Sequence, residues 1–197
     1  MNDESDHDES RHSYLRRLSP DAYRGHAYVH WSLTIEGRRR SWLTPEFHAT
    51  FRELLGHTAF RQSVCAPLYC LMPDHLHLLW VGFSESSDQR KAMRFLRART
   101  NKMLLNPGGF EWQKQPYDNV LREKDRNRDA FPSVAAYIRE NPLRAGLVDS
   151  ESKLSNYPYL GCYLPGYPDI SIWDRDFWDR FWKIYYERLL TRDEDRL

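Results

Sequence analysis

The sequence is poor in the features that mark several classes of protein. It has three cysteines, Cys65, Cys70 and Cys162, with no CxxC pair, so it predicts neither a disulfide framework nor a structural zinc site. It contains no apolar run long enough to span a bilayer, and its acidic first residues do not resemble a signal peptide. We therefore expect a cytoplasmic protein with no membrane partner.

The chain also lacks an excess of charge of either sign. It carries 29 basic and 28 acidic side chains, for a formal net charge of +1. This balance gives no argument for nucleic acid as a partner, because binding depends on where the charge lies. Residues 1–10 hold acidic side chains and no Lys or Arg, whereas basic side chains gather at Arg38-Arg39-Arg40 and between Arg90 and Lys102. Any one such cluster is most simply a solvated face.

The 197 residues, of which 41% are hydrophobic, are enough for one domain with a real core. Hydrophobic periodicity and the Gly and Pro positions predict strands at 27–35, 63–72 and 75–82, a short extended piece within 111–124, and four helices. The segments 63–72 and 75–82 are either two adjacent strands or one strand with a bend at Pro73. The helices are expected from Thr44-Pro45 to Gly56, from Asp88 to about residue 105, over 133–141, and from Asp174 onward. This order predicts an α+β sandwich, an antiparallel sheet with helices on one face.

The sharpest local feature is His75-Leu76-His77, at the start of one predicted strand. Residues i and i+2 of a strand point to the same face, so two imidazoles would lie side by side and Leu76 would point into the core. Such a pair could bind a divalent metal ion. From this short motif alone, two ordinary histidines near a strand edge are the more common interpretation.

A second candidate is Tyr137, in the helix predicted over 133–141. Asn141 follows four residues later and therefore lies on the same helical face. A tyrosine and a carboxamide there could meet a metal ion held by the two histidines, but the same periodicity fits a tyrosine packed in the core.

Two segments together resemble the signatures of the single-tyrosine HUH transposases, and most of all the branch associated with repetitive extragenic palindromes (REP). They are LMPDHLHLLW at 71–80 and YIRENPLRAGLV at 137–148. The pieces WQ at 112–113 and YDNVLR at 117–122 resemble the motif that lies between those signatures. The resemblance runs in family order from about residue 26 to about residue 148.

The resemblance implies a ferredoxin-like (RRM-like) sheet that carries the histidines and a helix that carries a nucleophile. By position, His75 and His77 would bind Mg²⁺ or Mn²⁺, Asn141 would be a third protein ligand, and Tyr137 would be the nucleophile. Attack on a phosphodiester would give a 5′-phosphotyrosine and a free 3′-hydroxyl, so the strand could be rejoined without ATP. The implied partner is single-stranded DNA, in a hairpin or palindromic repeat, bound by a monomer or a homodimer.

Several side chains are candidates for contact with that DNA. Those expected near the phosphates lie in the basic clusters or in the family-like motifs: Arg38, Arg39, Arg94, Arg97, Arg122 and Arg144. Unpaired bases could stack on aromatic rings, for which Trp31, Trp42, Trp112, Tyr117, Tyr157 and Tyr159 are available. For any one of these rings, a packing role is the more common one.

The chain is expected to divide into three parts. Residues 1–22 are predicted to be a flexible acidic arm, 23–148 the catalytic domain, and 149–197 a loop and an aromatic helix packed on the same domain. A dimer contact or a hairpin-binding arm is the alternative for this last part.

Two other functions fit the same residues. One is a catalytically silent nucleic-acid-binding regulator with the same fold, and the other is an unrelated metal-dependent hydrolase in which Tyr137 is structural. A covalent adduct between the protein and DNA would separate the three.

Overall fold

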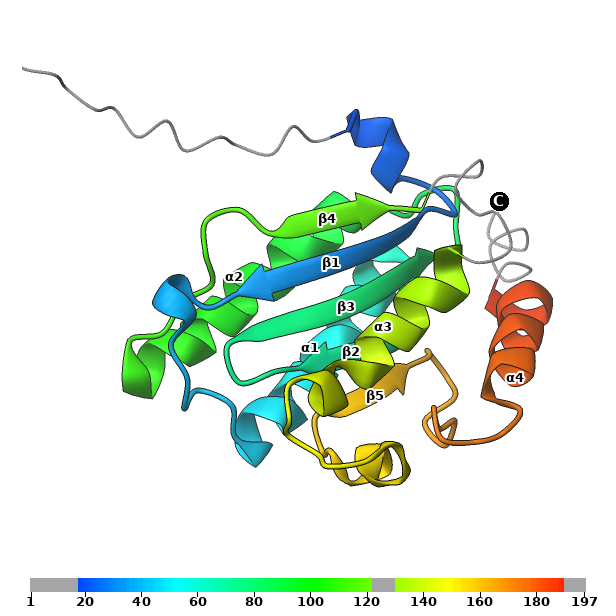
Figure 1. The fold of residues 1–197 in the computed structure, drawn as a ribbon. Helices are drawn as coiled ribbons and strands as arrows, with labels where there is room; N and C mark the ends of the chain where they lie inside the picture. The colour runs from blue at the N-terminus through cyan, green and yellow to red at the C-terminus, as the bar shows by residue number, and fades with distance from the viewer. Residues whose placement is uncertain (1–17, 122–129, 190–197) are drawn as a thin grey trace, which may run out of the picture.

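The computed structural model describes residues 18–121 and 130–189 of the chain (Figure 1). Its centre is a five-stranded sheet in which the strand order is β4-β1-β3-β2-β5 and every pairing is antiparallel. The strands are β1 (Tyr28–Thr34), β2 (Val64–Leu71), β3 (His75–Gly82), β4 (Tyr117–Val120) and β5 (Leu160–Tyr163).

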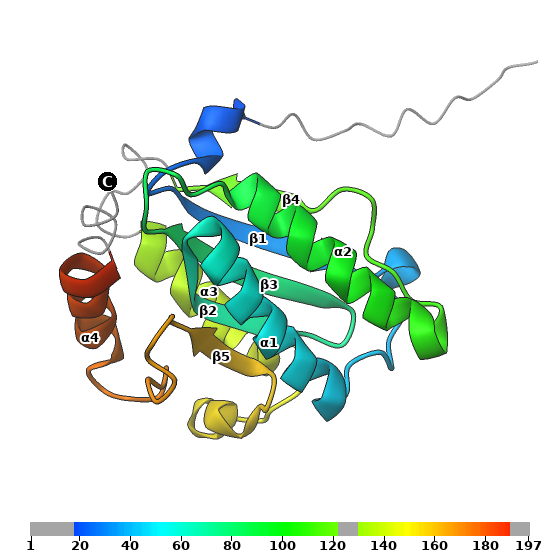
Figure 2. The ribbon, with the colours of Figure 1, turned by 180° about the vertical axis from the view of Figure 1, so that it is seen from behind.

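The first four strands and two helices follow the order β1-α1-β2-β3-α2-β4, with β1 and β3 at the centre of the four. This is the ferredoxin-like arrangement that the resemblance implies, so the predicted fold class is confirmed. Helices α1 (Pro45–Gln62) and α2 (Gln89–Gly108) lie side by side across one face of the sheet (Figure 2). Their apolar sides pack on a core that includes Trp31, Leu78 and Trp80.

The opposite face is covered as well, whereas the sequence predicts helices on one face. Helix α3 (Ala130–Arg144) lies in front of β2 and β3 in Figure 1. Between α3 and the sheet lies a second core, which includes Phe131 and Ile138. Helix α4 (Phe177–Ile184), continued by the π-helical residues Tyr185–Leu189, packs its aromatic side chains into this core. The physical reason is that β2 and β3 have apolar side chains on both faces. All of β2, and all of β3 after His75, is accordingly buried.

Helix α1 is longer than the sequence predicts. It continues through Gly56, the predicted end, and stops at Ser63, whose backbone is left-handed (φ 49°). A Cβ at position 56 would lie 2.7 Å from the Tyr163 hydroxyl oxygen. Gly56 therefore leaves room for the edge strand β5 and does not mark a helix end.

The region after residue 148 contains more regular structure than the predicted loop. It has a 3-10 helix (Glu151–Asn156) and then β5, which pairs with β2. The aromatic helix α4 is present, as predicted, and the Tyr185 hydroxyl donates to the Gly82 carbonyl (2.8 Å) at the end of β3. The boundaries proposed at 22/23 and 148/149 stay predictions, and most of the predicted acidic arm lies outside the described residues.

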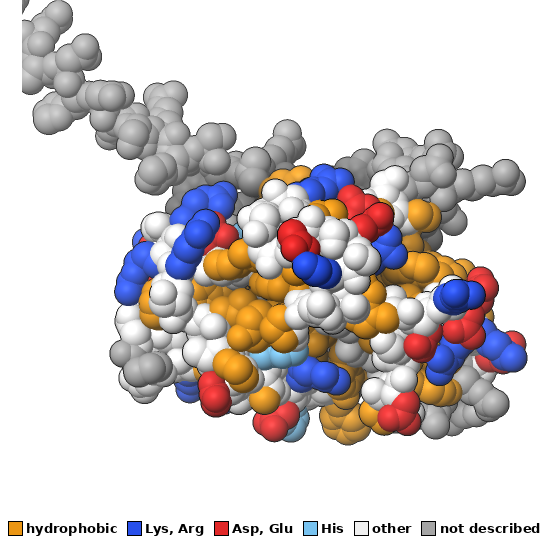
Figure 3. Space-filling model, turned by 60° about the horizontal axis from the view of Figure 1, so that its bottom comes forward, with side chains coloured by type: hydrophobic (Ala, Val, Ile, Leu, Met, Phe, Trp, Pro, Cys, Tyr) orange, Lys and Arg blue, Asp and Glu red, His pale blue; other side chains and the backbone are white. Residues whose placement is uncertain are grey.

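Acidic and basic side chains are interspersed on the surface. On the face that Figure 3 presents, Lys and Arg side chains stand in separate groups, with Asp and Glu side chains between them. No helix in the described part of the chain has both the length and the hydropathy needed to cross a membrane.

Candidate active site

The two predicted histidines lie together on the α3 side of the sheet. In the register of the sheet, His75 is opposite Thr34 and His77 is opposite Ser32 of β1. The two imidazole Nε2 atoms are 3.1 Å apart. The i, i+2 geometry predicted for His75 and His77 is thus present, and Leu76 between them is buried in the opposite core.

The other nitrogen of each ring is held by a neighbouring side chain. His75 Nδ1 is 2.6 Å from Asp74 Oδ1, and His77 Nδ1 is 3.0 Å from His30 Nε2. With the ring protons on the Nδ1 atoms, donated to Asp74 and His30, both Nε2 lone pairs are directed to one place. Partners of this kind fix the ring orientation of histidines that bind metals.

The geometry of the pair suits a hexacoordinate cation. Two nitrogens on adjacent corners of an octahedron, each about 2.1 Å from the ion, are about 3.0 Å apart. The observed 3.1 Å agrees with that spacing. Within the described ranges, no group of three or more His, Cys, Asp and Glu side chains is placed to hold a metal. An ion here would therefore need an amide oxygen, water or a phosphate oxygen to complete its shell. Mg²⁺ in proteins usually has such oxygen ligands.

Burial keeps two of these imidazoles neutral. It lowers the pKa of His77 to about 3, and the neighbouring His30 and His75 act in the same direction. Hydrogen bonding to Asn141 and the charge of Asp74 partly oppose this lowering of the His77 pKa. Burial also lowers the pKa of His30 to about 4. Because a metal binds the neutral imidazole, no proton needs to be displaced from His77 at neutral pH.

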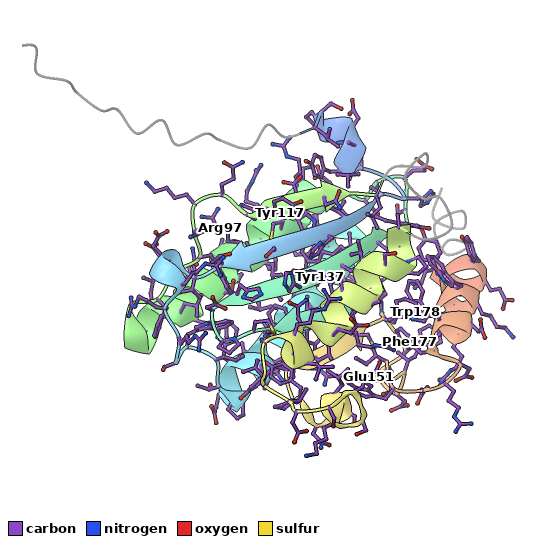
Figure 4. The ribbon with its side chains drawn as sticks, in the orientation of Figure 1. Arg97, Tyr117, Tyr137, Glu151, Phe177 and Trp178 are labelled. Carbon is purple, nitrogen blue, oxygen red and sulfur yellow. The ribbon has the colours of Figure 1, made fainter. Side chains whose placement is uncertain are left out.

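Tyr137 projects from α3 toward the histidines and remains 39% exposed. Its ring centroid is 5.3 Å from that of His77 and 6.1 Å from that of His30. The guanidinium carbon of Arg144, about two helical turns further on, lies 5.3 Å from the centre of the tyrosine ring. Figure 4 shows Tyr137 on the side of α3 that faces the uncovered part of the sheet. A phenol, a positive charge and two metal-binding nitrogens thus share one accessible place.

Asn141 lies against the same group and is buried (8% exposed). Its amide nitrogen donates to the Tyr137 carbonyl oxygen at 2.7 Å, and the side chain also hydrogen-bonds to His77. Because the amide nitrogen is engaged by the backbone, the carbonyl oxygen is the atom of Asn141 that could bind a cation.

The predicted DNA-contacting arginines have different surroundings. Arg38 donates to Asp74 (3.0 Å), and Arg39 donates to the carbonyls of Gly108 and Gly109 while its guanidinium lies over the Phe110 ring. Arg144 is paired with Glu140 at 2.9 Å. Arg94 and Arg97 line a hollow beside β4, and Arg122 lies outside the described residues. Of the five predicted arginines that the structure describes, Arg38 contacts Asp74 beside His75, and Arg144 lies against Tyr137.

Sequence reasoning missed His30 and Asp74. His30 is 7% exposed and comes from β1, 47 residues before the histidine that it contacts. A usable signal was the alternation of His30, Ser32 and Thr34, which puts polar residues on one face of an otherwise apolar strand. Asp74 lies next to His75 in the sequence, so it could be expected near the histidines. Its hydrogen bond to His75 Nδ1 could not be predicted from the sequence.

Comparison with known proteins gives one informative similarity. No family model matches the chain, and no curated protein sequence is similar to it. Among solved structures, it aligns with a REP-associated tyrosine transposase bound to a REP hairpin, with a TM-score of 0.60 and 18% identity over 75% of this chain and 81% of that chain. The chain shares the fold of that transposase.

A candidate transposase from Deinococcus radiodurans R1 also aligns, with a TM-score of 0.41 and 14% identity over 62% of this chain and 92% of that chain. That score is too low to support an argument. The first alignment confirms the resemblance found in the motifs at the level of the fold. In this fold, β3 carries His75 and His77, and α3 carries Tyr137 and Asn141.

Proposed function

We propose that the protein is a metal-dependent endonuclease and strand transferase that acts on single-stranded DNA through a phosphotyrosine intermediate. The observation that carries this proposal is the position of the exposed Tyr137 ring, 5.3 Å from the ring of His77, whose Nε2 points to the same place as that of His75. A core tyrosine would be buried, whereas Tyr137 is 39% exposed, and the Nδ1 partners of the two imidazoles fix the ring orientations that a metal would need.

In the proposed reaction, the Tyr137 hydroxyl oxygen attacks the phosphorus of a phosphodiester. The new bond joins that oxygen to phosphorus, the bond from phosphorus to the 3′-oxygen breaks, and the proton lost by the phenol is balanced by the proton gained at the 3′-hydroxyl. The product is a 5′-phosphotyrosine, which a second 3′-hydroxyl can attack to rejoin strands.

The residues around Tyr137 have distinct tasks in this proposal. His75, His77 and the carbonyl oxygen of Asn141 would hold Mg²⁺ or Mn²⁺, which when bound neutralises phosphate charge and makes the phosphorus more electrophilic. The guanidinium carbon of Arg144 lies 5.3 Å from the Tyr137 ring centre, so Arg144 could contact the phosphate that Tyr137 attacks. Asp74 and His30 hold the two imidazoles in the ligating orientation.

The proposed substrate is single-stranded DNA with a hairpin. The solved structure that shares this fold is bound to a REP hairpin. The site itself is open, since Tyr137 is 39% exposed, so a DNA strand can reach it without a lid having to move.

The test is covalent trapping. A pool of labelled single-stranded oligonucleotides, each with a hairpin and randomised flanks, is incubated with the full chain and Mn²⁺ and resolved on a denaturing gel. We expect a protein–DNA adduct from the wild type and none from Tyr137→Phe. Tyr186→Phe, which alters another exposed tyrosine, is the matched control and should give the wild-type yield.

Each other outcome would point to a different function for the protein. An adduct that survives Tyr137→Phe would disprove the assignment of the nucleophile. Cleavage with no adduct would point to a metal-dependent hydrolase, and hairpin binding with neither product would point to a silent regulator. His75→Ala and His77→Ala should each abolish the adduct while leaving most of the hairpin affinity, because the proposal makes these residues catalytic.

A further inference from the structure

Part of the sheet face that carries the histidines is not covered by a helix. Helix α3 lies over β2 and β3 in Figure 1, and its side chains also contact Tyr28 and His30 of β1, which are buried. The end of β1 at Ser32 and Thr34, and β4 beside it, are more open. Successive side chains of β4 point alternately to the open face and to the α2 side. The side chains of Tyr117 and Asn119, which point to the open face, are exposed. Tyr117 is 50% exposed, which is unusual for an aromatic residue in a strand.

The sheet register places Tyr117 in line with the site. Tyr117 is opposite Ser32 of β1, and Ser32 is opposite His77 of β3, so all three point to the same face. Two strand spacings separate Tyr117 from His77, a distance of about 10 Å between backbones. That distance is about the rise of three stacked nucleotides. Figure 4 shows β1 running between the labelled Tyr117 and Tyr137.

The other aromatic rings considered for stacking do not offer such a surface. Trp31 and Trp112 are 1% exposed, Trp42 is 5% and Tyr157 is 8% exposed, and all four belong to the two cores. Tyr159 is partly buried and packs with His48 and Tyr157, toward the β5 edge. Tyr117 is thus the one of the six with a largely open ring beside the histidines.

We propose that Tyr117 is a stacking platform for an unpaired base of the DNA strand, within about three nucleotides of the phosphate at Tyr137. This inference rests on the proposed function for its substrate. It assigns to the open part of the sheet the task of holding the strand next to the cleavage point. Ser32, half-buried between Tyr117 and His77, forms the floor over which the backbone would pass.

Charge at the edge of the sheet supports this path. β4 is an edge strand, and behind it a hollow of about 140 Å³ is lined by four basic residues, Arg90, Arg94, Arg97 and Lys114. The nearby acid Asp118 points away from the open face and accepts a hydrogen bond from Tyr23. A strand whose base lies on Tyr117 can therefore cross the β4 edge and bring its next phosphates to these cations.

The experiment measures binding separately from cleavage. Fluorescein-labelled dT15 is titrated with full-length Tyr137→Phe protein, without metal, and the Kd is compared after adding each of three changes to that background. Tyr117→Leu should weaken binding roughly 5- to 140-fold, the range expected for loss of one stacked base. Tyr117→Trp, which keeps an aromatic face, should stay close to the parent. Phe60→Leu is the control, because Phe60 is 86% exposed on α1, on the opposite side of the sheet.

A second readout locates the contact. dT15 with 4-thiothymidine at single positions is irradiated with the same proteins, and crosslinked peptides are identified by mass spectrometry. Crosslinks to Tyr117 that disappear in Tyr117→Leu would support the platform. An unchanged Kd for Tyr117→Leu, with crosslinks elsewhere, would overturn it even if the Tyr137 adduct forms normally. If no adduct forms on any hairpin but binding depends on the ring at position 117, the proposed chemistry fails and the binding surface stands.

Discussion

At the scale of single residues, the contact between His30 and His77 has the clearest consequence. His30 is not a proposed ligand, but its Nε2 lies 3.0 Å from the Nδ1 of His77 and so controls which nitrogen of His77 is free for a metal. Loss of such a partner commonly costs 10- to 100-fold in metal affinity. We therefore expect His30→Phe to weaken Mn²⁺ binding by about that factor, measured by electron paramagnetic resonance of the free ion.

His48→Phe is a suitable control for this prediction. Like His30, His48 has a pKa lowered to about 4, with burial as the main cause, but its Nε2 contacts the Tyr69 hydroxyl, away from the site. Its replacement should leave Mn²⁺ affinity unchanged. Equal affinities for wild type and His30→Phe would show that the contact does not orient His77.

The lowered pKa values also predict how stability depends on pH. His30 and His77 have folded-state pKa values of about 4 and about 3 against 6.5 in the unfolded chain, so the unfolded state takes up protons first as the pH falls. The stability due to these residues is present above pH 6.5 and decreases below it, by roughly 2 kcal/mol for each histidine between pH 7 and pH 5. Urea unfolding of the wild type should show this loss.

The same measurement on a double variant isolates the two histidines. His30→Gln with His77→Gln should lose less stability than the wild type between pH 7 and pH 5, because neither replacement titrates. An identical loss in both proteins would mean that other groups cause the pH dependence.

How much of the site could be read from the sequence follows from how local each interaction is. His75, His77, Tyr137 and Asn141 were predicted as site residues because strand and helix periods place them on shared faces and because their motifs resemble a family. His30 could not be paired with His77 in advance, since that contact depends on the register between β1 and β3. The uncovered position of Tyr117 likewise follows from where α3 lies, which is a property of the packing.

At the scale of secondary-structure elements, α4 contributes buried aromatic side chains to the core on the α3 side of the sheet. Phe181 is completely buried and contacts the rings of Phe177, Trp178, Trp182 and Tyr185. Replacing a buried phenylalanine by alanine costs about 3–5 kcal/mol. We expect that loss for Phe181→Ala in chemical denaturation, and less than about 0.5 kcal/mol for Phe60→Ala, since Phe60 is 86% exposed. A loss of less than about 0.5 kcal/mol for Phe181→Ala would show that α4 does not stabilise the domain.

The elements were predicted well where periodicity and capping agree. Asp88 caps α2 as expected, by accepting from the Lys91 amide at 3.0 Å, and the Pro73-Asp74 turn separates β2 from β3. The predictions failed where a tertiary contact overrides a local signal. Gly56 predicts a helix end, but α1 continues through it and the Tyr163 hydroxyl lies close to where a Cβ would be. β5 has only four residues, one of them Gly161, so its sequence gives little indication of a strand.

At the scale of the whole molecule, a net charge of +1 means that DNA affinity must come from a few local cations. Each phosphate contact to single-stranded DNA contributes a slope of about −0.7 to the dependence of log K on log salt. Arg94→Gln with Arg97→Gln, in the hollow beside β4, should therefore make this slope less steep by roughly 1.4 for dT15.

Arg180→Gln is the control for this experiment. Arg180 is on α4 and is paired with Asp174 at 2.8 Å, so it should leave the slope unchanged. If the double variant also keeps the wild-type slope, the DNA does not follow the β4 edge.

The position of β3 at the centre of the sheet predicts which parts of the fold open first on heating. β3 has a hydrogen-bonded neighbour on each side and is buried on both faces, so its backbone amides are the least able to open locally. In native-state hydrogen exchange, the amides around His77 should exchange only through global unfolding, while those of the four-residue edge strands β4 and β5 exchange sooner. The pair of imidazoles would then stay assembled until the whole domain melts, and the proposed stacking surface at Tyr117 would loosen first.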